Sequence, residues 1–180
     1  MKKALKILPF KTERCVIKAI GYEDISWYVD TIKQTFFNEF VDGKSSDNSD
    51  MALTGKLVGL ISSYKIGLSG RNEIRAIITI DGKPVGGITI FHASSPGSYD
   101  LGYWVIPEYQ GRGIAFEVLK GMTNKLEFNV RGLKLLRLIV RVDNVKSIRL
   151  SEKAGYKLIN SYQGKEKENL VYGYTPLKFG

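Results

Sequence analysis

The spacing of apolar residues divides the first part of the chain into strand-like and helix-like segments. Apolar and polar positions alternate from Thr12 to Ala19, as in a strand with one buried face. From Asp24 to Phe40 the apolar residues lie three and four positions apart, which predicts a helix with one buried side. Helical spacing returns from Met51 to Leu68, after a polar, turn-rich stretch from Val41 to Asp50 that predicts a loop.

The middle of the chain predicts an antiparallel meander. Ile74 to Ile80 and Val85 to Phe91 are rich in β-branched residues, and Asp81-Gly82-Lys83-Pro84 joins them. The Asp-Gly pair is a strong hairpin signal. A third apolar run, from Tyr99 to Ile106, follows a serine-rich turn and is stopped by Pro107. These three runs are expected to be neighbouring antiparallel strands.

The last third of the chain alternates between helical and strand-like patterns. In order, these are a helix from Gly113 to Asn129, a strand from Leu135 to Val142, a helix from Asp143 or Asn144 to Gly155, and a hairpin of Tyr156 to Tyr162 with Leu170 to Thr175. The whole order predicts an α+β fold in a single domain over residues 1–180. Its sheet is expected to be mixed, mostly antiparallel, with about seven strands flanked by about four helices.

Composition is ordinary for a globular protein, with 43% hydrophobic and 25% charged residues. The longest apolar run, Leu133 to Val142, contains three basic residues and is too short to span a membrane. Pro9 and nearby charged residues interrupt what would be the apolar core of a signal peptide. We therefore expect a cytoplasmic protein without a membrane partner.

The net charge of +9 is the unusual bulk property. Such an excess favours polyanionic partners, among them nucleic acid, a ribosome, an acidic protein or a phosphate-rich cofactor. The basic residues are spread along the chain and form no block, so direct nucleic-acid binding is not expected, whereas proximity to a ribosome stays open. With one cysteine, Cys15, and one histidine, His92, no His/Cys metal site is expected.

A short glycine-containing segment lies between the third meander strand and the following helix. It consists of Gln110, Gly111, Arg112, Gly113, Ile114 and Ala115. Backbone N–H groups at a helix N-terminus bind pyrophosphate well, helped by the helix dipole. The glycines give the loop freedom and remove side-chain bulk, and the glutamine and arginine offer donors. Taken alone, the segment is equally compatible with a plain turn from strand to helix.

Two common phosphate motifs do not match, since no Gly-Lys-Ser/Thr follows and the dinucleotide fingerprint needs a third glycine in a parallel setting. The segment resembles the Gln/Arg-x-x-Gly-x-Gly/Ala signature of the GNAT superfamily of N-acetyltransferases. Further residues are similar to the branch that contains the ribosomal-protein N-terminal acetyltransferases. They are Thr12 to Arg14, Val16 to Lys18, Leu101 to Val105, Pro107 to Tyr109, Asp143, Asn144, Ser147 and Glu152 to Tyr156.

The resemblance covers nearly the whole chain and implies a GNAT-like fold that uses acetyl-coenzyme A. It implies that the third meander strand, which ends at Trp104, Val105 and Ile106, parts from the next strand and admits the pantetheine arm. Backbone groups of Val105 and Ile106 would pair with the arm, and one N–H would polarise the thioester carbonyl. Backbone amides of residues 110–115 would hold the pyrophosphate.

Candidate catalytic residues also follow from the resemblance. Asp100, on the parting strand, is the candidate base and would act through water; the alternative is an ordinary strand-edge carboxylate. Asn144 and Ser147, one helical turn apart, would face the arm and the sulfur, whereas the alternative for Asn144 is a helix cap. Many relatives carry a tyrosine general acid in this helix, where Ser151 stands here. Ser147, Tyr156 or water are therefore the open choices for protonating the thiolate.

The predicted activity is transfer of an acetyl group to a primary amine, first of all the N-terminal amine of a protein or peptide. Small amines such as an antibiotic, an amino acid or a polyamine are the alternative acceptors, and a non-catalytic acyl-coenzyme A sensor is the alternative from another class. Tyr103, Trp104, Trp27 and Tyr28 are candidates for lining the acceptor pocket. The resemblance also suggests a homodimer through the final strands.

Overall fold

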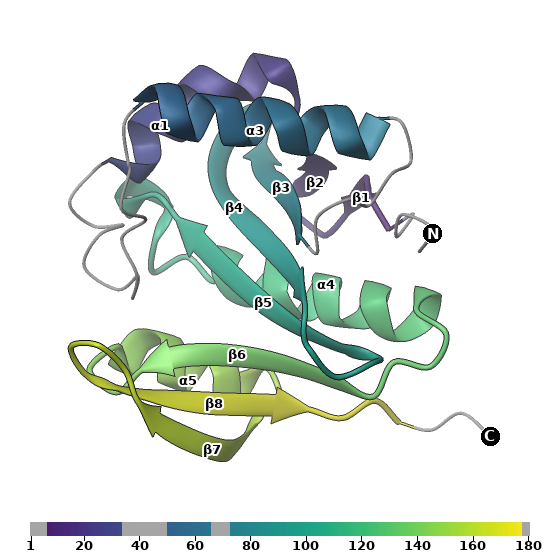
Figure 1. The fold of residues 1–180 in the computed structure, drawn as a ribbon, viewed down its shortest axis with the longest axis vertical. Coiled ribbons are helices and arrows are strands. Elements are labelled where there is room, and N and C mark those ends of the chain that lie inside the picture. The colour runs from purple at the N-terminus through teal and green to yellow at the C-terminus, as the bar shows by residue number, and fades with distance from the viewer. Residues whose placement is uncertain (1–6, 34–49, 66–72, 178–180) are drawn as a thin grey trace.

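The structure, a computed structural model, describes residues 7–33, 50–65 and 73–177 and is built on one mixed sheet (Figure 1). The sheet has eight strands in the order β1-β2-β3-β4-β5-β6-β8-β7. The strands are β1 (Phe10–Lys11), β2 (Val16–Ala19), β3 (Glu73–Ile80), β4 (Lys83–His92), β5 (Ser98–Val105), β6 (Leu135–Arg141), β7 (Lys157–Gln163) and β8 (Glu168–Tyr174). The α-helices are α1 (Ile25–Ile32), α3 (Asp50–Lys65), α4 (Ile114–Asn129) and α5 (Val145–Lys153).

Helices cover the sheet on both faces and divide its apolar residues into two clusters. Ile78, in the middle of β3, packs in the main core with residues of α4 such as Val118 and Met122. Its neighbour Ile77 packs on the opposite face with α1 and α3. This division follows from the two-residue period of a strand. Each fully buried aliphatic side chain of this kind stabilises the fold by about 1.5–3 kcal/mol.

The meander follows the pattern that the sequence predicts. β3 and β4 are antiparallel and joined at Ile80 and Lys83 through Asp81 and Gly82, both of which have positive φ, at 49° and 76°. Two positive φ values in a two-residue connection are typical of the hairpin turns that Asp-Gly favours. β5 then pairs antiparallel with β4 from Tyr99 to Val105.

The predicted α+β class, the order of the elements and the mixed sheet are confirmed. One difference is the first predicted strand, which is interrupted because the backbone turns back between Thr12 and Cys15, with a 2.9 Å hydrogen bond. The predicted final hairpin is present as the antiparallel pair of β7 and β8, with β8 next to β6 and β7 as an exposed edge strand. The predicted loop at 41–50, apart from Asp50, and Phe36, Phe40 and Leu68 lie outside the described residues. Within the described ranges, no helix is long and apolar enough to cross a membrane.

The sheet opens between β5 and β6. These two strands are parallel and pair only at Ser98 with Leu135, Tyr99 with Leu136 and Asp100 with Arg137. Beyond Asp100 they diverge, as the ribbons in Figure 1 show. Residues 101–105 of β5 therefore have a strand partner on the β4 side and an opening on the other side. The opening lies at the carboxyl ends of two parallel strands, where ligand sites of such sheets are commonly found.

Candidate functional site

The glycine segment forms an exposed cradle at the N-terminus of α4. Gly111 and Gly113 have φ values of 72° and 79°, in the left-handed region, where an L side chain costs about 1–2 kcal/mol. Gly113 is the residue that precedes the helix, and it offers no side chain to cap the first-turn amides. Those N–H groups are therefore directed outward at the positive end of the helix dipole, an arrangement that fits a pyrophosphate.

A brace from the start of the chain holds this cradle. Glu117, in the first turn of α4, accepts hydrogen bonds from the Thr12 hydroxyl and from the backbone N–H and Nε of Arg14, at 2.8 and 2.7 Å. Nη1 of Arg14 donates to the carbonyl of Arg112 at 2.8 Å. Burial alone would raise the pKa of Glu117, but the bonds from Thr12 and Arg14 outweigh it and lower the pKa. This brace is not apparent from the sequence, because Thr12 and Glu117 are 105 positions apart.

The cradle adjoins the opening between β5 and β6. The side-chain amide of Gln110 donates to the Val105 carbonyl at 2.8 Å. The Ile106 N–H donates to the Val85 carbonyl of β4 at 2.9 Å, and the Ile106 carbonyl accepts from Tyr109 at 3.0 Å. Because successive strand residues direct their backbone groups to opposite edges, those of Val105 point away from β4 and toward the opening. Both Ile106 groups, by contrast, have partners within the protein.

A pair of hydroxyl groups bridges β5 and α5. The phenol oxygen of Tyr103 lies 2.8 Å from Oγ of Ser147, and both residues are half-buried. Asn144 is the N-cap of α5, and its Oδ1 accepts from the Ser147 N–H at 3.1 Å. The fully buried Ser151 donates to the Ser147 carbonyl one turn later, at 2.8 Å. Asn144 therefore has the capping contact that was the alternative reading of this residue, and it orients the turn that carries Ser147.

Asp100 lies where the two strands part and is bound by an arginine. Its two carboxylate oxygens accept from Nε and Nη2 of Arg137 at 2.6 and 2.9 Å. The two residues face each other in the last register pair before the strands diverge. The hydrogen bonds to Asp100 raise the pKa of Arg137. This bidentate ion pair links β5 to β6 at the closed end of the opening.

The aromatic residues expected in the acceptor pocket are divided between the two faces of the sheet. Trp104 packs against α1, stacked on Trp27 with ring centroids 5.6 Å apart, and edge-on to Tyr28 at the same distance. Tyr103, one residue earlier, points to the α4 and α5 face. His92 packs against the ring of Tyr99 at 4.7 Å. Trp104, which lies at the end of the strand expected to contact the cofactor arm, thus has its side chain on the face opposite Ser147.

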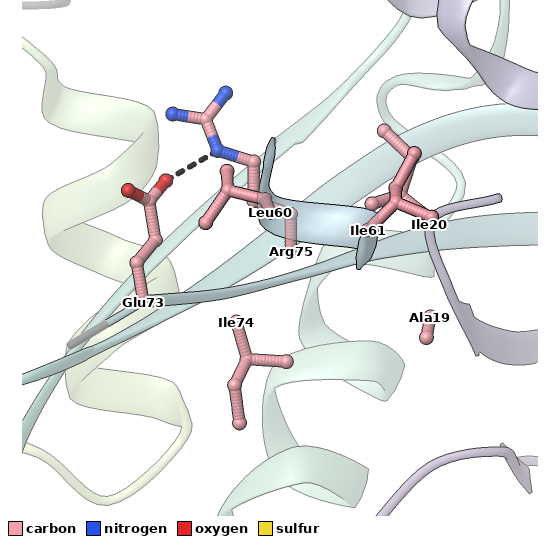
Figure 2. Close-up of a pocket in the computed structure, with 7 residues that line it drawn as sticks. All are labelled: Ala19, Ile20, Leu60, Ile61, Glu73, Ile74 and Arg75. Atoms are coloured by element: carbon pink, nitrogen blue, oxygen red, sulfur yellow. Dashed lines mark hydrogen bonds and ion pairs between the residues drawn. The ribbon is translucent and has the colours of Figure 1, made fainter. Parts of the chain in front are cut away.

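A small hollow lies on the α1 and α3 face, between β3 and α3 (Figure 2). It has about 20 Å³ of room for the centre of a water molecule, which suits one water and is too small for a pantetheine arm. Arg75 points from its wall toward the carboxylate of Glu73, to which it is ion-paired. Nη1 of Arg75 also donates to the Tyr28 hydroxyl at 3.1 Å. This hollow is distinct from the opening beside the cradle.

Tyr156, one of the open choices for protonating the thiolate, lies in the core. It is 2% exposed, and its hydroxyl is bonded to Thr123 of α4 at 2.7 Å. Burial raises the pKa of this phenol, and the Thr123 bond only partly offsets the effect. These contacts are those of a packed core residue.

Comparison with known proteins agrees with this geometry. Residues 34–157 match the model of the acetyltransferase (GNAT) domain family. A search of curated proteins gives no match. Among solved structures, the ribosomal L7/L12 α-N-protein acetyltransferase RimL in complex with coenzyme A has a TM-score of 0.77 at 14% identity, covering 92% of this chain and 96% of its own.

Two further structures have a similar fold. RimJ of Mycobacterium smegmatis, in complex with a coenzyme A disulfide, has a TM-score of 0.74 at 19% identity, covering 89% of this chain and 81% of its own. AAC(6')-Ib in complex with ribostamycin and coenzyme A has a TM-score of 0.73 at 14% identity, covering 91% and 94%. The family model spans most of the chain, including the whole cradle and the parting of β5 and β6. This protein therefore belongs to the GNAT family of N-acetyltransferases, which use acetyl-coenzyme A as the acetyl donor.

Proposed function

We propose that this protein acetylates the N-terminal amine of a protein or peptide by direct attack of the amine on the thioester of acetyl-coenzyme A. The observation that carries this proposal is the opening between β5 and β6, which adjoins the glycine cradle through the Gln110 to Val105 hydrogen bond. The cradle offers hydrogen-bond donors for a pyrophosphate. The opening is a slot with an exposed strand edge that an amide-bearing arm can pair with.

Each part of the site has a role in this proposal. Backbone amides of residues 110–115 hold the pyrophosphate, and the Arg112 side chain, stacked on Tyr109 at 5.4 Å, adds positive charge beside it. The Val105 N–H is directed toward the opening, where it stabilises negative charge that develops on the carbonyl oxygen. Asn144 holds the first turn of α5 so that the Ser147 hydroxyl faces the same space.

Direct transfer fits the state of the single cysteine. Cys15 is 2% exposed and packs in the main core. Burial raises the pKa of its thiol, and the Glu117 carboxylate raises it further. A neutral, buried thiol is a poor nucleophile, so the acetyl group has no route through Cys15.

The contacts of Asp100 support a positioning role. Both carboxylate oxygens already accept N–H bonds from Arg137, and taking up a proton would break this pairing. We assign Asp100 to holding β5 and β6 at the distance where they part. The amine then loses its proton to water, either before it binds or in the opening.

The charges on the α1 and α3 face favour an acceptor with one amine. A polyamine or an aminoglycoside carries several positive charges and needs several free carboxylates. Among the described residues of this face, Asp24 binds Lys18 at 2.9 Å, and Glu73 and Asp50 are paired with Arg75 and Lys33, whereas Asp30 of α1 contacts the Ser26 hydroxyl and has no ion pair. With a net charge of +9, the chain is better suited to a peptide N-terminus, which carries a single amine. The stacked rings of Trp27 and Trp104 provide an aromatic surface that such a peptide can contact.

The test is release of free thiol from acetyl-coenzyme A in the presence of four acceptor sets: peptides with free N-termini, the same peptides blocked at the N-terminus, polyamines and aminoglycosides. We expect turnover with free N-termini and none with blocked ones. A preference for polyamines or aminoglycosides would replace the acceptor class. If acetyl-coenzyme A binds tightly but no amine causes release of its thiol, the protein is an acyl-coenzyme A sensor and not an enzyme.

A further inference from the structure

The hydroxyl pair of Tyr103 and Ser147 lies at the open end of the slot. Tyr103 is in the part of β5 that β6 does not pair with, three positions beyond Asp100. Ser147 is in the first turn of α5, the helix that follows β6. A hydrogen bond of 2.8 Å joins them, so one hydroxyl comes from each wall of the opening. In the proposed function, this is the space in which the thioester is cleaved.

We infer that Tyr103 is the group that protonates the departing thiolate, with Ser147 holding its hydroxyl in place. The inference rests on the proposed function and names a residue for a step that the sequence analysis left open. A phenol has an ordinary pKa of about 10 and a thiol one of about 8.5. Tyrosine is therefore a much closer match to the leaving group than serine, whose alcohol is a far weaker acid.

The surroundings of Tyr103 keep its hydroxyl protonated and fixed in direction. Burial raises the pKa of the phenol, and the bonds to Ser147 and Ser151 offset this only in part. The hydroxyl is thus protonated at neutral pH. The ring packs against the main core, which fixes its direction. Ser151, which stands where many relatives carry a tyrosine acid, donates to the Ser147 carbonyl. A phenol beside Ser147 is therefore supplied by Tyr103 of β5.

The step balances without a further reactant. The amine nitrogen forms a bond to the carbonyl carbon, the C–S bond breaks, and its electron pair stays on sulfur. Sulfur takes the proton of the Tyr103 hydroxyl and leaves as a thiol. The attacking nitrogen, which carries a positive charge after it bonds to the carbonyl carbon, gives one proton to the phenolate, directly or along Ser147 or water, as the neutral amide forms. The sum is amine plus thioester giving amide plus thiol.

The first test is Tyr103→Phe, which removes the hydroxyl and keeps the ring in the core. We expect kcat with acetyl-coenzyme A to fall about a hundredfold, the lower range for general acid catalysis, with the Kd of coenzyme A and Tm nearly unchanged. Tyr156→Phe is the matched variant, because it removes another buried phenol that is bonded to a hydroxyl. It is expected to keep a rate near that of wild type.

The second test changes the leaving group. In the selenoester analogue of acetyl-coenzyme A the departing selenolate is a much weaker base and needs no proton to leave. With this analogue the defect of Tyr103→Phe should shrink to less than about tenfold, since the contribution of the acid is no longer used. A structural defect would slow both esters equally.

The outcomes separate the two proposals. A wild type that binds acetyl-coenzyme A without turning over any amine overturns both. Wild-type turnover with an unchanged Tyr103→Phe rate overturns the Tyr103 assignment alone, as does a loss of rate shared equally by both esters. A large loss in Tyr156→Phe that vanishes with the selenoester would assign the proton to Tyr156 instead.

Discussion

At the scale of single residues, the site depends on which neighbour each side chain has, and sequence order does not reveal this. Tyr103 and Trp104 are adjacent but lie on opposite faces of β5, one bonded to Ser147 and the other stacked on Trp27. From the sequence, both were candidates for lining the acceptor pocket. The alternation of the strand was available from the sequence, but which face α5 covers was not, because that depends on packing between distant elements.

The ion pair of Asp100 gives the first residue-scale prediction. In Asp100→Asn the neutral amide cannot neutralise Arg137, whose side chain is 33% exposed. We expect stability to fall by about 1 kcal/mol, or about 2–4 °C in Tm. The dependence of kcat/KM on pH should keep its shape, since the carboxylate takes no proton in our scheme. Rates of both proteins from pH 6 to 9 check this.

Arg137→Gln serves as the control for Asp100→Asn, because it breaks the same pair from the other side and should have a similar effect on Tm. If Asp100→Asn removes an ionisation from the pH profile while Arg137→Gln leaves it in place, Asp100 is a base after all. The sequence-based role would then be restored.

At the scale of elements, short-range signals predicted local structure well, whereas the pairing of strands distant in sequence was left undetermined. The β3 to β4 hairpin follows from Asp81-Gly82, and the start of α4 follows from Gly113, because each depends on the conformation of a few consecutive residues. The position of β8 between β6 and β7 depends on which strand buries Tyr172 and Leu170 against the core, a choice that local patterns do not encode. The Glu117 brace likewise depends on the packing of residues that are distant in sequence, and local patterns do not encode it.

The brace gives a pH prediction for α4. The pKa of Glu117 is lower in the folded protein than in the unfolded chain, so its stabilisation is complete above the unfolded value of about 4.3. It is lost as pH falls through the folded value. We expect Glu117→Gln to be less stable than wild type at pH 7, and the difference should shrink as pH falls below the unfolded value. Urea unfolding across this range measures the difference.

Glu13→Gln is the control for Glu117→Gln, since it removes an exposed carboxylate from the turn between Thr12 and Cys15, which the Glu117 side chain contacts. Its stability should follow that of wild type at every pH. A gap between wild type and Glu117→Gln that stays constant down to pH 3 would mean that packing, and not the charge of Glu117, holds the brace.

At the scale of the whole molecule, the sheet consists of two parts that share few backbone contacts. β1 to β5 form one continuous antiparallel part, and β6 to β8 form the other. The three register pairs of β5 with β6 join them, together with α4, which packs on the main core. A ligand in the opening contacts both parts at once and should tighten their coupling.

Coenzyme A at a hundred times its Kd should stabilise the protein by about 2.7 kcal/mol, or about 5–10 °C in Tm. Amide hydrogen exchange should slow most at residues 101–105 and in the first turn of α5, on the two walls of the opening. Pantetheine, which lacks the phosphates, is the informative comparison: at equal saturation it should protect the strand and leave the α4 N-terminus unprotected. Protection confined to the cradle would contradict the bridging arrangement.

The parting of β5 from β6 also bears on how the acetyl donor is recognised. An unpaired strand edge normally invites another strand and must be shielded from foreign chains. Here the edge faces inward, opposite a second wall, so a bulky polypeptide is kept out while a thin chain that carries amides can enter. The pantetheine arm of the donor would then be recognised in the way that a sheet edge recognises an added strand. Backbone hydrogen bonds and the width of the opening would determine the fit, and side chains would not. Such a slot would tolerate changes in the acyl group more readily than changes in the arm.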